Sequence, residues 1–207
     1  TAKKYEITKS DDVDYAITVR EMASWIREGN IDFRKLDNSR FDDFTGTSAG
    51  LIFGTSGGVM ESMLRYSYHL ITHRNPPKRL LNNKLVRGLE DIKTGVIKLG
   101  DKDIRVAVIN GTGDVPKLMD RIKNGEKFDI VEVMACDGGC IAGGGGSKQY
   151  KITNINKEAR SKAIYHKDKT VKRKNSYENP KIKRLYKELL IEPNSEEAIK
   201  LLHVNYR

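Results

Sequence analysis

The stretch DIRVAVINGTGDVPKLMDRIKNGEKFDIVEV, residues 103–133, decides the fold class of this 207-residue chain. It predicts a strand over Ile104–Ile109, a helix over Val115–Lys123 that Gly125 ends, and a second strand over Phe128–Val133. A strand, a helix and a strand form a βαβ unit, so the two strands should be parallel and joined by a right-handed crossover. Ligands in open α/β sheets bind beyond the carboxyl ends of the strands, which directs attention to the residues that follow each strand.

Two more helices are predicted upstream of this unit. The sequence TVRE at residues 18–21 is a capping box that follows a short predicted strand at Val13–Ile17, and Gly29 ends the helix. The glycine-rich stretch GTSAGLIFGTSGG at residues 46–58 passes directly into the second helix, which NPP at residues 75–77 stops.

A basic segment follows from residue 150, and its apolar spacing predicts helices, including one over Glu196–Leu202. The fold class is therefore α/β. We expect residues 1–149 to form a lobe with a mixed sheet of about four strands flanked by helices. Residues 150–207 are expected to form a basic helical C-terminal segment.

The charge balance restricts the partners of the chain. Lys and Arg number 38 against 28 Asp and Glu, which gives a net charge of +10. This excess is dispersed and lacks the Arg-aromatic interleaving of nucleic-acid readers, so it predicts a solvated face or a docking surface for an acidic protein. The apolar runs are far shorter than the roughly 20 residues of a membrane span, and without an export signal we expect a cytoplasmic protein.

The sequence MACDGGCIAGGGGS at residues 134–147 directly follows the second predicted strand. Two cysteines four residues apart among glycines offer two soft ligands and a backbone that can approach a bulky inorganic group. Two buried thiols beside a flexible turn are an equal alternative, because a zinc site or an iron–sulfur cluster normally takes four ligands. No third cysteine stands at the spacing of radical-SAM proteins, and the glycines fit neither a Walker nor a Rossmann pattern.

Together these motifs resemble the C-terminal half of the catalytic, H-cluster domain of [FeFe]-hydrogenases. Residues 134–147 are similar to the family signature MACxGGCxxGGGQP, and FGTSGGVMESMLR at residues 53–65 is similar to FGxTGGVMEAALR. TAKKYE at residues 1–6 resembles the stretch after the cysteine in MPCxxKKxE. Agreement in VDYAITVRE, SYENPKIKRLY and LLHVNY extends the resemblance over essentially the whole chain.

The resemblance implies a [4Fe-4S] cubane held by four cysteines and joined through one of them to a diiron site, the two together being the H-cluster. Cys136 and Cys140 would be the last two cubane ligands, with Cys140 the bridging thiolate. Lys3 would donate a hydrogen bond to a cyanide ligand, and Glu6 would be a carboxyl group in the proton route. The residues implied to line the diiron site are Met134, Phe53 and Gly54.

The departures from the family pattern matter equally. The other two cubane cysteines belong to family motifs upstream of Thr1, so we expect the chain alone to lack the H-cluster and to be inactive. Its glycine loop should then be mobile. Gly146 and Ser147 replace the family's Gln-Pro, and Asp137 stands where proline is common and is expected to point to solvent.

The resemblance implies a hydrogenase that interconverts H2 and protons with electrons from a ferredoxin-type carrier. This chain would be a fragment or subunit, and its partner would be the upstream half of the domain or a second subunit that supplies the other cysteines. One alternative is an iron–sulfur assembly protein resembling nuclear prelamin A recognition factor-like proteins. Another is a non-catalytic sensory relative, although GGVMESMLR together with Lys3 and Glu6 favours hydrogenase.

Overall fold

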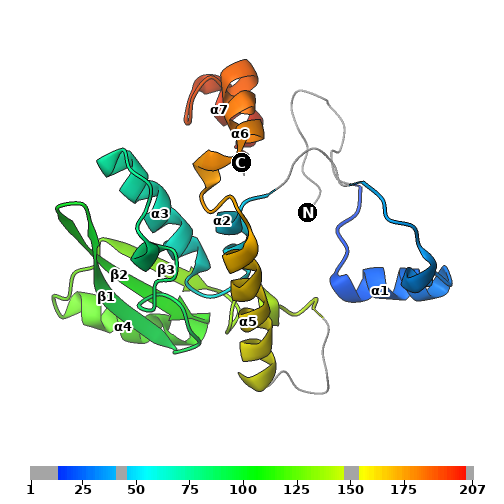
Figure 1. Cartoon of the computed structure of the whole chain (residues 1–207). Helices are drawn as coiled ribbons and strands as arrows, with labels where there is room; N and C mark the ends of the chain where they lie inside the picture. The colour runs from blue at the N-terminus through cyan, green and yellow to red at the C-terminus, as the bar shows by residue number, and fades with distance from the viewer. Residues whose placement is uncertain (1–13, 41–45, 147–153, 204–207) are drawn as a thin grey trace. The chain divides into compact units, whose positions relative to one another are not determined.

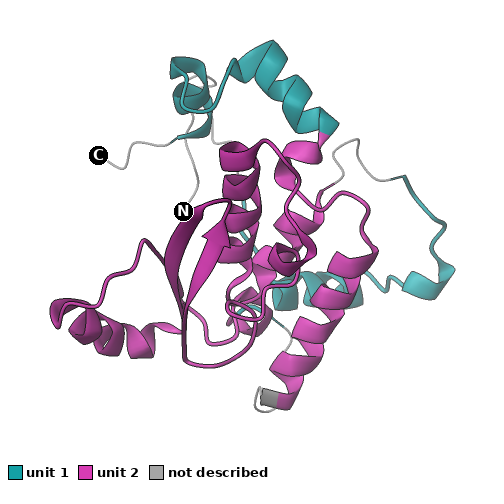
Figure 2. Ribbon diagram, turned by 60° about the vertical axis from the view of Figure 1, so that its left-hand side comes forward, with its two compact units in different colours: residues 1–44, 145–147, 180–207 teal, residues 45–144, 148–179 magenta. Residues whose placement is uncertain are grey.

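The computed structural model describes residues 14–40, 46–146 and 154–203. Two compact units divide the chain: unit 1 holds residues 1–44, 145–147 and 180–207, and unit 2 holds residues 45–144 and 148–179 (Figure 2). The helices and strands are, in order, α1 (Val19–Glu28), α2 (Ser48–Leu51), α3 (Gly58–Thr72), β1 (Ile92–Leu99), β2 (Lys102–Asn110), α4 (Val115–Lys123), β3 (Ile130–Met134), α5 (Asn154–Thr170), α6 (Pro180–Leu185) and α7 (Glu196–Leu202) (Figure 1).

The sheet of unit 2 has the strand order β1-β2-β3. β2 and β3 are parallel, with Asn110 opposite Met134, which confirms the βαβ unit. β1 is antiparallel to β2 and was not predicted; Gly100, at φ +67°, and Asp101 form a two-residue turn between them. The described residues thus form a mixed sheet of three strands, where about four were expected.

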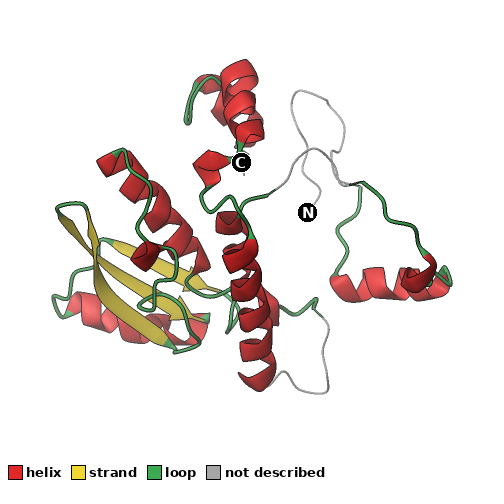
Figure 3. Ribbon diagram, in the orientation of Figure 1, coloured by secondary structure: helices red, strands yellow, loops and turns green. Residues whose placement is uncertain are grey.

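Helices cover both faces of this sheet, α3 on one side and α4 on the other (Figure 3). Because side chains alternate along a strand, β2 sends Val106 and Val108 toward α3, and Ala107 and Ile109 toward α4. All four are buried, as expected for a strand covered on both faces. The chain is therefore an α/β fold with its core on both sides of β2.

The described part of unit 1 starts at residue 14, and its first helix is α1. The capping box is confirmed: the amide of Thr18 donates to Glu21 at 2.6 Å, and the amide of Glu21 donates to Thr18 Oγ1 at 3.3 Å. The strand predicted at Val13–Ile17 is wrong for residues 14–17, which lie in no sheet of the described chain. A strand requires a hydrogen-bonded neighbour, and Tyr15 is instead 83% exposed.

In unit 1, the side chains of α1 differ in burial from those of the C-terminal helices. α1, all of whose residues are described, buries none of them, and its apolar Trp25 is 55% exposed. In the C-terminal part of unit 1, by contrast, Leu190 and Ala198 are buried, and Ser195 caps α7 by accepting from the amide of Ala198. In the described part of the chain no helix combines the length and the apolar character needed to cross a bilayer.

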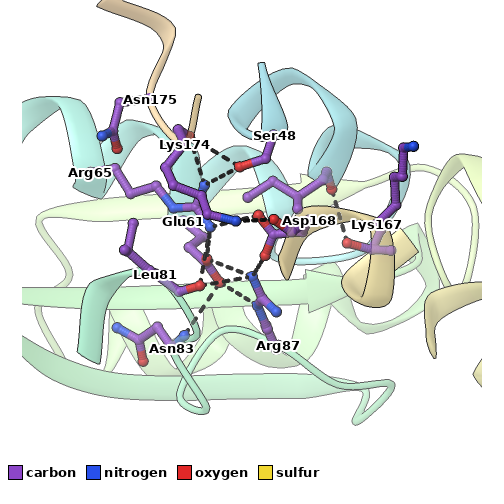
Figure 4. A network of polar contacts seen from close by, with 12 residues as sticks. Ser48, Glu61, Arg65, Leu81, Asn83, Arg87, Lys167, Asp168, Lys174 and Asn175 are labelled. Atoms are coloured by element: carbon purple, nitrogen blue, oxygen red, sulfur yellow. Dashed lines mark hydrogen bonds and ion pairs between the residues drawn. The ribbon is translucent and has the colours of Figure 1, made fainter. Parts of the chain in front are cut away.

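A buried cluster of four charged side chains joins α3, the segment before β1, and α5 in unit 2 (Figure 4). Glu61 of α3 lies at its centre, 2.5 Å from Arg65 Nη2 and 2.5 Å from Arg87 Nε. Asp168 of α5 accepts from Arg87 at 2.6 Å and from Arg65 at 3.4 Å. The carbonyl of Leu81 accepts from both guanidinium groups at 3.2 Å.

The surroundings of Asp168 and Arg87 favour the charged forms of these two side chains. Burial raises the pKa of Asp168, but the hydrogen bond from Arg87 and the charges of both arginines outweigh it, and the pKa lies below its ordinary value. The guanidinium of Arg87 also lies over the Tyr165 ring, 4.3 Å from its centroid. Charges buried in this way are held by one another, so removal of one leaves another uncompensated.

We predict that Glu61→Gln lowers the free energy of unfolding by about 3–5 kcal/mol, because two buried guanidinium groups then share one carboxylate. Urea unfolding measures the change. The matched control is Asp120→Asn in α4, whose ion pair with Lys123 spans 3.8 Å with both side chains 72% exposed. It should cost less than about 1 kcal/mol. Similar losses for the two variants would contradict a special role for the buried cluster.

Candidate functional site

The carboxyl ends of β2 and β3 lie side by side, and the segment after β3, residues 135–143, is here called the cysteine loop. Asn110, the last residue of β2, is buried and anchors this loop to the sheet. Its Nδ2 donates to the carbonyl of Leu89 at 2.9 Å and to Asp137 at 3.0 Å. Its Oδ1 accepts from the amide of Gly138 at 2.6 Å. A strand end therefore fixes the start of the loop.

Two glycines let the cysteine loop approach the segment before α3. Gly138 and Gly139 have φ of +93° and +88°, a region that favours glycine. A methyl group on Gly139 would lie 2.8 Å from the amide nitrogen of Ser56 and 2.9 Å from the carbonyl oxygen of Gly54. The amide of Ser56 also donates to Gly138 at 3.4 Å. Backbone meets backbone here with no room for a side chain.

The two thiols of the loop, Cys136 and Cys140, are free and exposed. Among residues 14–40, 46–146 and 154–203, no group of three or more His, Cys, Asp or Glu side chains could hold a metal ion. Two exposed thiols beside a close-packed glycine backbone fit one half of the ligand set of an iron–sulfur cluster. The described chain therefore offers thiols, the type of ligand that an iron–sulfur cluster uses, but only two of the four that it normally takes.

The other predicted site residues divide into those that the structure places and those that it does not describe. The carbonyl of Gly54 faces Gly139, Phe53 beside it is 46% exposed, and Met134 is half-buried where β3 ends. The structure thus places Met134 directly before the cysteine loop and Gly54 against the middle of the loop. Lys3 and Glu6 lie outside the described residues.

α5 supplies contacts to the loop that sequence reasoning missed. Lys157 forms an ion pair with Asp137, and Arg160 Nη1 donates to the carbonyl of Ile141 at 2.6 Å. Asp137 was expected to point to solvent; its side chain is 57% exposed, yet one oxygen accepts from Asn110 and the other from Lys157. A polar residue closing a buried strand could have indicated Asn110, but nothing distinguishes Lys157 within a uniformly basic stretch.

Glu132 links β3 to the start of α3. Its buried carboxylate accepts from the amide of Gly57 at 2.7 Å and from that of Met60 at 2.5 Å, which satisfies two amides at the helix N-terminus. Burial raises the pKa of Glu132 above its ordinary value of 4.5; these two amides and Lys93 lower it in part. This carboxyl group fixes the distance between the first turn of α3 and the strand that leads to the cysteines.

Comparison with known families agrees with this geometry. Residues 1–144 match the family described as iron only hydrogenase large subunit, C-terminal domain, and residues 154–207 match the iron hydrogenase small subunit. The fold and the thiol-bearing loop thus define an α/β lobe of an iron–sulfur oxidoreductase family. The chain belongs to the iron-only hydrogenase family.

Curated relatives cover nearly all of the chain. The NADP-reducing hydrogenase subunit HndD of Solidesulfovibrio fructosivorans is 38% identical over 99% of the chain, and iron hydrogenase 1 of Clostridium pasteurianum is 34% identical over 100%. The chain spans 36% and 38% of the lengths of these two proteins. Protein NAR1 of Arabidopsis thaliana is also similar, with 31% identity over 96% of the chain.

Solved structures of hydrogenases share the fold. A variant of the [FeFe]-hydrogenase HydA1 from Chlamydomonas reinhardtii superimposes with a TM-score of 0.73 at 31% identity, and the match covers 95% of this chain and 56% of that one. The similarity therefore includes both the sheet of unit 2 and the helices that follow it. Relatives of this family are larger proteins or subunits of complexes, of which this chain corresponds to one part.

We predict a pH signature for Glu132 in the comparison with Glu132→Gln, which retains an acceptor oxygen. A carboxyl group whose pKa is raised on folding binds more protons in the folded state, so it contributes stability below pH 4.5 that is lost as pH rises through the folded pKa. As pH rises from 4.5 through the folded pKa of Glu132, the free energy of unfolding of the wild type should therefore fall relative to that of the variant. Urea titrations between pH 4 and pH 8 measure it; parallel curves would contradict it.

We predict that Gly139→Ala separates the cysteine loop from residues 54–56. The positive φ alone should lower the free energy of unfolding by about 1–3 kcal/mol, and the contact with Gly54 adds to the loss. Gly144→Ala is the matched control, since nothing lies within 4 Å of its added methyl group. Its effect should stay below about 1 kcal/mol. Denaturant unfolding distinguishes the two, and equal effects would mean that the close approach is unimportant.

Proposed function

We propose that this chain is part of an iron hydrogenase that catalyses the reversible oxidation of H2 and reduction of protons, with electrons from a ferredoxin-type carrier. The observation that carries the proposal is the position of two free thiols on a glycine-packed loop at the carboxyl edge of the βαβ unit, in a chain of the iron-only hydrogenase family. This edge is where α/β sheets bind their ligands.

In this proposal Cys136 and Cys140 would supply two of the four thiolates that hold a [4Fe-4S] cubane, and Cys140 would be the thiolate shared with the diiron site. The bound H-cluster supplies the redox chemistry of hydrogen. Met134, Phe53 and Gly54 would line the diiron site, and Gly139 leaves no room for a side chain between the loop and residues 54–56. The proposal retains Lys3 as a hydrogen-bond donor to a cyanide ligand and Glu6 as a proton carrier.

The remaining two cysteines come from an upstream half of the domain or from a second subunit. The apolar side chains Val19, Met22 and Trp25, exposed at helical spacing on α1, support such a partner, because an apolar stripe on a helix is typical of a surface that packs against another element. Without that partner the chain holds no complete H-cluster and is inactive. The division into an α/β lobe of residues 1–149 and a helical segment of residues 150–207, and a cytoplasmic location, belong to the same proposal.

A second candidate function is assembly of iron–sulfur clusters. It is favoured by the similarity to proteins named for that role, among them the cytosolic iron-sulfur assembly component 3 of Mus musculus, 26% identical over 99% of the chain. Such a protein would use the same thiols for a cubane without the diiron site. The higher identity to hydrogenases, 38% and 34%, supports hydrogenase as the first candidate.

The test compares the chain alone with the chain joined to its upstream sequence after maturation. We expect the joined form to hold about six irons, one cubane plus a diiron pair, and to evolve H2 from reduced viologen. Cys136→Ser and Cys140→Ser should each lose iron and activity. Neither substitution should disturb the fold, because both thiols are exposed. A joined form that holds a cubane and no diiron site, and makes no H2, would replace this proposal with the assembly function.

A further inference from the structure

The inward face of α5 is polar where it meets the cysteine loop. Lys157, Ser161 and Asp168 follow one another at helical spacing and are all buried. Asp168 enters the charged cluster with Arg87, which fixes the C-terminal end of α5 in place. The opposite end of this face, around Lys157 and Arg160, is thereby held against the loop that carries the thiols.

The side chains of this face contact the cysteine loop both before and after Cys140. Lys157 pairs with Asp137, between the two cysteines, and its stem lies so near Gly138 that a methyl group there would come within 3.2 Å of Lys157 Cδ. Arg160 donates to the carbonyl of Ile141, just beyond the second cysteine. One helix thus contacts the loop at two points that enclose Cys140.

Burial separates this lysine from an ordinary surface charge. The side chain of Lys157 is 10% exposed, whereas that of Lys162 on the same helix is 79% exposed and lies 3.7 Å from Glu158. Exposed pairs of the second kind contribute little. The ammonium group of Lys157 is largely removed from water, although its partner Asp137 is 57% exposed, so water screens this charge-assisted bond less than it screens the pair of Lys162. Asp137 is also bonded to Asn110, so Lys157 completes a chain of contacts from the end of β2 to α5.

We propose that Lys157 and Arg160 are positioning residues that hold the cysteine loop in its ligand-ready conformation before any cluster binds. Residues of the small-subunit family region would thus prepare the ligands carried by the large-subunit region. The expectation of a mobile glycine loop in the absence of metal is replaced by that of an ordered one. The proposal rests on the proposed function in taking the thiols as ligands, but the order of the metal-free loop is testable without it.

The test is peptide-resolved hydrogen exchange on the protein with its upstream sequence, expressed without maturation and free of metal. In Lys157→Met, which removes the charge and keeps the stem, the peptide covering residues 134–143 should exchange about fivefold faster, since loop amides lose an anchored partner. The peptide of β2 should be unchanged. Lys162→Met, with the same charge change on the exposed side of α5, is the matched control and should exchange like the wild type.

Two further variants separate positioning from general stability. Lys157→Arg keeps the charge and should restore most of the protection. Asp137→Asn keeps an oxygen that can accept from Asn110, so the double variant with Lys157→Met should exchange no faster than Lys157→Met. Unchanged loop exchange in Lys157→Met would overturn the proposal. Equal acceleration in the loop and in β2 would also overturn it, because it would show a merely structural role.

A second readout concerns the ligands themselves. After cluster reconstitution, iron release to a chelator should be severalfold faster in Lys157→Met than in Lys162→Met, while both variants bind iron at first. If the loop loses protection in Lys157→Met but no variant and no wild-type protein binds iron, the positioning role stands and the proposed function fails. If iron binds and the loop exchange is insensitive to Lys157, the function stands and the positioning role fails.

Discussion

The buried meeting of Glu61 and Asp168 with Arg65 and Arg87 is the constraint on which unit 2 depends. Charges removed from water must be paired, so α3, α5 and the segment before β1 have to arrive together at this point. Apolar packing would tolerate several arrangements of these elements, whereas directional bonds to shared carboxylates tolerate few. The sheet forms the hydrophobic core, and the buried charges fix the position of α5 relative to α3, the helix that covers one face of the sheet.

The geometry of the thiol-bearing loop follows from that register. The loop directly follows β3, and Asn110 holds its first turn by a hydrogen bond from the amide of Gly138. Gly139 allows the loop to contact the backbone of residues 54–56. Glu132 fixes the first turn of α3 against the same strand. Because these contacts come from different elements, the position of the cysteines depends on the packing of the whole unit and not on a local turn alone.

Much of this was predictable from sequence, and the failures have physical causes. The βαβ unit was predicted because Val106–Ile109 is an uninterrupted apolar run, as a strand buried on both faces requires. β1 was missed because Gly95 and two lysines break its alternation, although the turn at Gly100 was a usable sign. The cysteines and Gly54 were proposed as site residues on the basis of motifs. Lys157 was not, because the inner face of α5 is polar and carries no apolar periodicity.

The two family regions occupy residues 1–144 and 154–207 of one polypeptide. Side-chain bonds hold α5 against α3, the segment before β1 and the cysteine loop. None of these bonds involves the peptide link between the two family regions. The helix α5 thus meets the first family region through a noncovalent interface within one polypeptide, and the buried charges determine how it packs there.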